Sequence, residues 1–184
     1  MKTVLVPLAQ GCEELEAVTI IDLLRRAEVQ VVTASLDNER TITASRGVVL
    51  VADHTLEQLL AQSFDLIVLP GGAGGGGADL LQQDLRIQSL LQKQLSQGRF
   101  VAAICAAPKV LLSAGVLDGK RITAYPGVLS PNASFILDEL TDVIQDGQII
   151  TSRGPGTAMD FALTLIELLT GKEKRNFVEK GLVR

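Results

Sequence analysis

The segment RFVAAICAAPKVLLSAG, residues 99–115, decides the fold of this chain. Its first part, Arg99 to Ile104, is a short apolar run typical of a strand buried on both faces. Its second part, Ala106 to Ala114, is predicted to be a helix that ends at Gly115, a residue common just beyond a helix C-terminus. A strand that passes directly into a helix is the repeating unit of a parallel α/β sheet.

The same alternation of strand and helix extends over the rest of the chain. The other predicted strands are residues 3–8, 29–35, 48–51, 64–69, 121–124 and 148–152, and the other predicted helices are residues 15–27, 80–97 and 157–169. No linker-like stretch or repeat interrupts this order, so we expect one domain over residues 1–184, of the α/β class with a mostly parallel central sheet. Ligands of such sheets bind beyond the carboxyl ends of the strands. The segments that follow residues 8, 69, 104 and 152 are therefore the first candidates for a functional site.

Composition narrows the class of protein. The 184 residues are 47% hydrophobic and 3% aromatic, which predicts a globular domain with an aliphatic core. A net charge of -4 argues against a nucleic-acid or anionic-membrane footprint. Two cysteines do not make a disulfide framework, so a reducing cytoplasm is the expected location. No apolar run reaches the roughly 18 residues that a membrane span needs.

Cys105 stands where the predicted strand passes into the predicted helix, followed by Ala106-Ala107-Pro108. Small residues on both sides permit the tight, strained turn that exposes a nucleophile at a strand–helix elbow. Backbone N–H groups at the start of the helix favour a thiolate. The alternative is a buried structural cysteine, since free cysteine is among the most buried residue types.

Three glutamates and the second cysteine follow the first predicted strand. Glu13 and Glu14 suit the positive N-terminal end of the first helix. Glu16 either shares that role or points inward, where burial raises the pKa of a carboxyl and keeps a proton ready for a hydrogen bond to a thiolate. Cys12 lies beside Glu13 and Glu14, whose charges raise the pKa of a thiol. We therefore favour Cys105 as the reactive cysteine.

The glycine-rich segment of residues 71–77, GGAGGGG, is a weak match to a dinucleotide fingerprint because it follows a middle strand. The amides of Gly71 and Gly72 are instead candidates for an oxyanion hole. The single histidine, His54, is expected near a helix start as a surface or capping residue, and a Cys–His dyad would have to recruit it from a different strand end. Two cysteines and one histidine argue against a dedicated zinc site, and we expect no metal and no cofactor.

Four motifs occur together: Glu13-Glu14-Leu15-Glu16, Leu69-Pro70-Gly71-Gly72, residues 102–108 (AAICAAP) and residues 151–157 (TSRGPGT). On these motifs the chain resembles the ThiJ/PfpI superfamily, whose domain is similar to that of class I glutamine amidotransferases. It is most similar to the branch that contains the Parkinsonism-associated protein deglycase and bacterial YajL-type proteins. The resemblance covers essentially the whole chain and implies a flavodoxin-like three-layer sandwich and a homodimer.

The resemblance also implies roles for individual residues. Cys105 corresponds to the nucleophile, and Glu16 to the carboxyl partner of its thiol. The implied oxyanion and pocket residues are Gly71, Gly72, Ala106, Tyr125 and Pro155, and the implied interface arginines are Arg26 and Arg46.

One position departs from the family pattern. Many relatives have a histidine near the nucleophile where this sequence has Tyr125, in Ile122-Thr123-Ala124-Tyr125-Pro126. A tyrosine, whose ordinary pKa is about 10, does not act as an imidazole base at neutral pH. This argues against a Cys–His mechanism of the protease or amidotransferase type.

The resemblance implies a deglycase or glyoxalase. Such an enzyme removes methylglyoxal and glyoxal from modified thiols, amines and nucleotides, or converts methylglyoxal to lactate, during oxidative and carbonyl stress. The alternative is a redox-sensing chaperone of unfolded proteins, whose cysteine oxidises to a sulfinate. A nucleotide-binding module built on the glycine-rich segment fits the motifs less well. The expected partners are small aldehydes, glycated molecules and a second copy of the chain, with no specific nucleic-acid sequence and no membrane.

Overall fold

The computed structural model describes residues 1–72 and 74–184, and Ala73 of the glycine-rich segment lies outside the described residues. The strands are β1 (Thr3–Leu8), β2 (Gln30–Ser35), β3 (Thr41–Thr43), β4 (Val49–Val51), β5 (His54–Thr55), β6 (Leu66–Leu69), β7 (Phe100–Ile104), β8 (Arg121–Ile122), β9 (Ile136–Leu137), β10 (Val143–Asp146) and β11 (Ile149–Ser152). The helices are α1 (Glu14–Arg26), η1 (Leu56–Leu59), α2 (Ala78–Gln83), α3 (Leu85–Ser96), α4 (Pro108–Ser113), η2 (Pro155–Thr157), α5 (Ala158–Thr170) and α6 (Lys172–Gly181), where η marks a short 3-10 helix.

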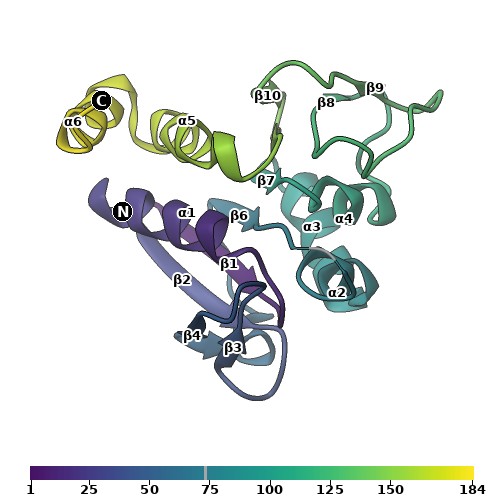
Figure 1. Cartoon of the computed structure of the whole chain (residues 1–184), viewed down its shortest axis with the longest axis horizontal. Helices are drawn as coiled ribbons and strands as arrows, with labels where there is room; N and C mark the ends of the chain where they lie inside the picture. The colour runs from purple at the N-terminus through teal and green to yellow at the C-terminus, as the bar shows by residue number, and fades with distance from the viewer. Residues whose placement is uncertain (73) are drawn as a thin grey trace.

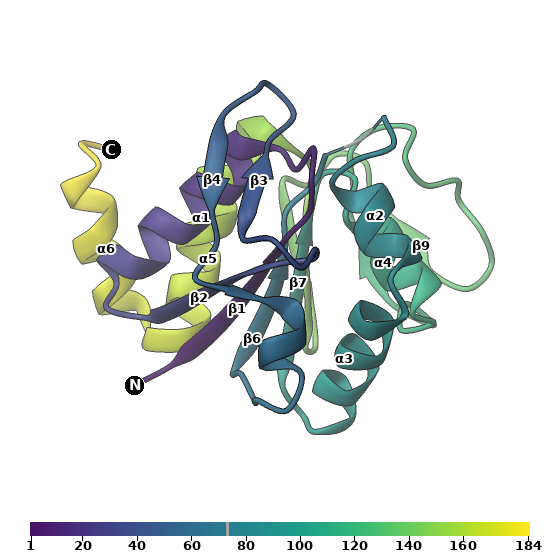
Figure 2. The same cartoon turned by 90° about the horizontal axis from the view of Figure 1, so that it is seen from below.

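A central sheet with strand order β10-β11-β7-β6-β1-β2-β5 forms the middle layer (Figure 1). Every neighbouring pair in it is parallel except β10 with β11. Helices α1, α5 and α6 cover one face, and α2, α3 and α4 cover the other (Figure 2). The predicted α/β class with a mostly parallel sheet is therefore confirmed.

Alternation along the strands divides the core between the two faces of the sheet. In β1, Val4 and Val6 pack into the core beneath α1 and α5, whereas Leu5 packs into the core beneath α3 and α4. This is the expected consequence of side chains pointing to opposite sides at successive strand positions. Helix α5 contributes Phe161 and Leu165, both fully buried, to the first core. Apolar side chains thus cover both faces of the sheet, and polar functional side chains are expected at its edges.

The single helix predicted for residues 80–97 is wrong. The chain forms two helices, α2 and α3, because Asp84 adopts an extended conformation with φ -84° and ψ 112°. Its carboxylate accepts a hydrogen bond from the N–H of Arg86 at 2.8 Å and so caps α3. An aspartate that caps the start of a helix has a non-helical backbone conformation, so it cannot also continue the helix before it.

Two of the predicted strands lie outside the central sheet. Strand β4, within the predicted residues 48–51, pairs with β3 in an antiparallel hairpin that was not predicted. Strand β8, within the predicted residues 121–124, pairs with β9. Helix α6, which follows Gly171, was also not predicted. Within residues 1–72 and 74–184, no helix is both long and apolar enough to cross a membrane.

The parallel register brings four strand ends to one edge of the sheet. Leu69 of β6 is opposite Ala103 of β7, and Ile104 of β7 is opposite Ser152 of β11. Strand β1, next to β6, ends at Leu8 on the same side. The segments after these four ends carry all four sequence motifs, and the fold therefore places those motifs together.

Candidate active site

Cys105 lies on the elbow between β7 and α4. Its φ is +63°, a left-handed conformation that costs a residue with a side chain about 1–2 kcal/mol. Two hydrogen bonds hold the elbow: Cys105 N–H donates to the carbonyl of Ser152 at 3.0 Å, and its carbonyl accepts from Tyr125 N–H at 2.8 Å. The thiol is half-buried, with the N–H of Ala106 directed at its sulfur. Because α4 begins only at Pro108, this single amide replaces the predicted set of helical N–H groups.

Glu16 is the buried partner of this thiol. It lies in the first turn of α1 with no exposed surface, and its Oε2 accepts a hydrogen bond from Gly71 N–H at 2.8 Å. Its carboxyl also hydrogen-bonds with the Cys105 side chain. Burial raises the pKa of Glu16 to about 7, so the inward-pointing alternative is the one observed. Its second oxygen, Oε1, has no hydrogen-bond partner in the part of the chain that the structure describes.

The two groups compete for one proton. Burial, and then the charge and hydrogen bond of Glu16, raise the pKa of Cys105 to about 12, while the Ala106 amide lowers it. Protonation of Glu16 removes its charge, whereas burial and the more distant charge of Glu13 continue to raise the pKa of Cys105. Protonation of Glu16 therefore lowers the pKa of Cys105, and the thiolate depends on this proton as well as on the Ala106 amide.

Gly71 separates these two side chains. A methyl group built on Gly71 would lie 2.7 Å from Glu16 Oε2 and 2.8 Å from Cys105 Cβ, so only glycine fits. Its N–H is already engaged by Glu16, and the predicted oxyanion role of that amide is not available in this arrangement. Gly72 has φ +113° and approaches Gly11 so closely that a methyl group would lie 2.4 Å from the Gly11 carbonyl oxygen. The Gly72 N–H has no acceptor among the described residues and remains a candidate oxyanion donor.

Tyr125 and Pro155 lie at the same edge of the sheet. The Tyr125 ring is half exposed and rests on Gly154, where an added methyl group would lie 3.1 Å from Tyr125 Cδ2. Pro155 begins η2, just beyond the end of β11. The fold thus places both residues on the β7–β11 side of Cys105.

Arg46 lies at the tip of the β3–β4 hairpin and is attached to α1 through its backbone. Glu14 accepts hydrogen bonds from Arg46 N–H and from the Ser45 hydroxyl, both at 2.8 Å. Although burial opposes them, these bonds hold the pKa of Glu14 below its ordinary value. The Ser45 hydroxyl also lies 3.0 Å from Glu13 Oε2. Sequence analysis missed this anchor because Glu14 and Ser45 are 31 residues apart and no local pattern connects them.

Arg26 and His54 lie away from Cys105 within one chain. Arg26 is ten positions beyond Glu16 on α1, about 15 Å along the helix axis, and pairs with Asp22 at 2.7 Å. His54 lies on the edge strand β5, four strand spacings or about 19 Å from β7. Within one chain, His54 is therefore far from the Cys105 elbow.

Cys12 is fully buried, and burial followed by the charge of Glu14 raises its pKa to about 11. The prediction that charge disfavours its thiolate holds, but burial is the larger cause.

These features define a class: an α/β protein whose cysteine stands on a strand–helix elbow beside a buried carboxyl. The profile of the DJ-1/PfpI family matches residues 2–168, and the chain belongs to this family. It is 45% identical over 185 residues to protein dj-1beta of Drosophila melanogaster, covering 99% of this chain and 97% of that protein. The crystal structure of the fly protein has a TM-score of 0.94 and 43% sequence identity, with 99% and 97% of the two chains covered.

Two further relatives bear on the chemistry. The chain is 35% identical over 176 residues to glutathione-independent glyoxalase DJR-1.2 of Caenorhabditis elegans, which covers 94% of this chain and 91% of that protein. A structure of oxidised DJ-1 from Toxoplasma gondii has a TM-score of 0.93 and 37% sequence identity, covering 100% of this chain and 98% of the other.

Proposed function

We propose that this protein is a cysteine-dependent enzyme that converts methylglyoxal and glyoxal to lactate and glycolate and removes them from glycated thiols, amines and nucleotides. The observation that carries the proposal is the contact between the Cys105 thiol and the buried carboxyl of Glu16, whose pKa is raised to about 7 by burial. A group with that pKa both accepts and donates protons at neutral pH. The glyoxalase name of the nematode relative supports the same substrate class.

The first step is addition of the thiol to the aldehyde. The Cys105 sulfur forms a bond to the aldehyde carbon, and the carbonyl electron pair moves to the oxygen. The thiol proton passes through Glu16 to that oxygen, which yields a hemithioacetal. The Gly72 N–H, which has no acceptor among the described residues, is the candidate donor to the developing negative charge.

The second step is an internal redox reaction. The Glu16 carboxylate takes the hydrogen from the former aldehyde carbon as a proton and returns it to the neighbouring carbon. The aldehyde carbon becomes a thioester while the ketone becomes an alcohol, so no outside oxidant or reductant is required. Water then hydrolyses the thioester, releasing lactate and restoring the thiol. With a glycated thiol or amine, the Cys105 sulfur attacks the same carbon and displaces the original thiol or amine, which leaves with a proton from Glu16.

Proton NMR of methylglyoxal tests the proposal. We expect lactate from the wild type, none from Cys105→Ala, and a sharp loss with Glu16→Gln. Cys12→Ala is the matched cysteine control, because Cys12 is fully buried and lies outside the proposed chemistry. Lactate formation that persists in Cys105→Ala would refute the proposal.

A redox-sensing chaperone is the second candidate. Cys105 is half-buried whereas Cys12 has no exposed surface, so peroxide reaches only the former. The oxidised Toxoplasma relative supports this alternative. After mild peroxide, mass spectrometry is expected to find added oxygen on Cys105 and not on Cys12. Suppressed aggregation of an unfolded client by the oxidised wild type, and not by Cys105→Ala, would favour the chaperone.

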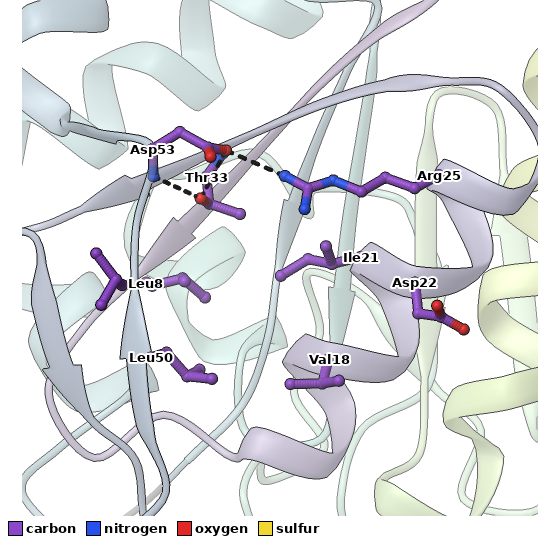
Figure 3. A pocket seen from close by; sticks show the side chains of 9 residues that line it. Leu8, Val18, Ile21, Asp22, Arg25, Thr33, Leu50 and Asp53 are labelled. Carbon is purple, nitrogen blue, oxygen red and sulfur yellow. Dashed lines mark hydrogen bonds and ion pairs between the residues drawn. The ribbon is translucent and has the colours of Figure 1, made fainter.

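We also propose that the chain forms a homodimer through the face made by α1 and the β3–β4 hairpin. Leu15 and Val18 of α1 are about half exposed, and Val49 and Val51 of β4 are 60% and 65% exposed. A hollow of about 320 Å³ lies between the two elements. Figure 3 shows the side chains that line it, among them the Arg25–Asp53 ion pair. Contiguous apolar surface of this kind favours association.

Light scattering tests this interface. The double variant Val18→Glu, Val49→Asp is expected to be monomeric. Leu140→Glu is the matched control, since Leu140 is 87% exposed and lies in a different part of the fold. A wild type that is already monomeric at high concentration would refute the dimer.

A further inference from the structure

Tyr125 is an aromatic side chain held in place at the rim of the candidate site. Its N–H donates to the Cys105 carbonyl at 2.8 Å, and its own carbonyl accepts from Val128 N–H at 3.1 Å. The preceding turn is anchored by Thr123 N–H, which donates to Thr151 Oγ1 at 2.9 Å. The backbone of Tyr125 is therefore fixed on both sides, next to Cys105.

One side of the ring is covered and the other is exposed. Gly154 lies against the ring so closely that a methyl group there would be 3.1 Å from Cδ2, and the residue as a whole is 49% exposed. Its hydroxyl has no hydrogen-bond partner among the described residues. A half-exposed ring that packs on Gly154 and whose hydroxyl has no partner among the described residues offers a stacking surface.

The opposite side of Cys105 leaves no room for a substituent. Gly71 separates the thiol from Glu16 so tightly that even one methyl group does not fit there. Ala106, whose N–H points at the sulfur, is buried as well. A group attached to the carbonyl carbons of a Cys105 adduct therefore has no room on the Gly71 side, and the half-exposed Tyr125, whose N–H donates to the Cys105 carbonyl, is a neighbouring surface open to it.

We infer that Tyr125 is a specificity-determining residue that favours α-ketoaldehydes with a planar aromatic substituent over methylglyoxal. The aromatic group stacks on the exposed part of the ring while the aldehyde reaches the sulfur. Offset or edge-to-face contacts between aromatic rings change affinity by about 2- to 12-fold. The part of this inference that concerns turnover rests on the proposed function. The part that concerns binding of an aromatic group does not.

Turnover is compared with phenylglyoxal and methylglyoxal, whose products are mandelate and lactate. Tyr125→Leu keeps an apolar side chain without a ring, and Tyr125→Phe keeps the ring without the hydroxyl. We expect the ratio of kcat/KM for phenylglyoxal to that for methylglyoxal to fall about 2- to 12-fold in Tyr125→Leu, mainly through KM, and to persist in Tyr125→Phe. An unchanged ratio in Tyr125→Leu would overturn the inference.

Binding is measured separately by fluorescence. The sequence has one tyrosine and no tryptophan, so tyrosine emission reports on Tyr125 alone. Mandelate is expected to change this emission saturably at lower concentrations than lactate does. If wild type converts neither aldehyde, the proposed function fails but the mandelate titration still decides the inference. Equal responses to the two acids, or no response, would contradict it.

Discussion

Replacing Glu16 by glutamine should change the pH dependence of stability in a predictable direction. The pKa of Glu16 is raised by burial from 4.5 to about 7. Between these two values the unfolded chain is ionised while the folded chain keeps its proton, so wild-type stability falls as pH rises from about 4.5 through 7. Each pH unit of this window costs about 1.4 kcal/mol. Ionisation of Glu16 lowers the free energy of unfolding by about 2–3 kcal/mol between pH 5 and pH 8. Glu16→Gln does not lose this stability, because glutamine does not ionise.

Urea unfolding followed by far-ultraviolet circular dichroism measures the effect at the two pH values. We expect Glu16→Gln to be close to wild type at pH 5 and about 2–3 kcal/mol more stable at pH 8. Glu39→Gln is the matched control, because Glu39 is exposed and makes no hydrogen bond through its side chain among the described residues. Parallel pH profiles for wild type and Glu16→Gln would show that Glu16 is ionised in the folded state at pH 5, and the proton-sharing argument would fail.

Substitutions at Gly71 and Asp53 test the packing around the site and the hydrogen bonds at the edge of the sheet. Gly71→Ala should destabilise the fold by about 1–3 kcal/mol and stop turnover, because the new methyl group would lie 2.7 Å from Glu16 Oε2; Gly156→Ala, with no atom within 4 Å, should unfold at the wild-type urea concentration. Asp53→Ala should cost about 1–3 kcal/mol in the same assay, because the buried N–H of Thr33 loses its acceptor at 2.9 Å. Although burial opposes it, hydrogen bonding from Thr33 lowers the pKa of Asp53, so stability from this group is lost as pH falls through that pKa, and Asp53→Asn should flatten the acid side of the stability profile.

Most of the central sheet could be predicted because its strands are buried on both faces. Strands such as β1 and β7 are continuous apolar runs, and this pattern is produced by the two cores that they separate. The division of residues 80–97 could not be predicted from periodicity, since both helices have apolar faces and only the conformation of Asp84 separates them. The β3–β4 hairpin depends on its contacts with α1 across the sequence, and short strands of this kind carry little pattern of their own.

The candidate site was predictable in its residues and not in its electrostatics. The elbow at Cys105 follows from the small residues around it, whereas the sequence leaves the inward position of Glu16 as one of two alternatives. The protonation state does not follow from the sequence, because it depends on burial, on the Gly71 amide and on the distance between two side chains that are 89 positions apart. The engagement of Gly71 N–H by Glu16 shows the same limit: the sequence predicts which amides lie nearby, and only the fold decides which one remains free.

The site concentrates several unfavourable features at one edge of the sheet. Cys105 has a left-handed backbone, Glu16 is a buried carboxyl with one oxygen unpartnered among the described residues, and the space between them admits no side chain on Gly71. Each of these would be removed by selection for stability alone. They are tolerated because the helix and strands that carry them are held by the apolar cores on both faces of the sheet. The strain and the raised pKa are therefore consequences of the same packing, and substitutions that loosen either core beneath β7 should lower the pKa of Glu16 together with stability.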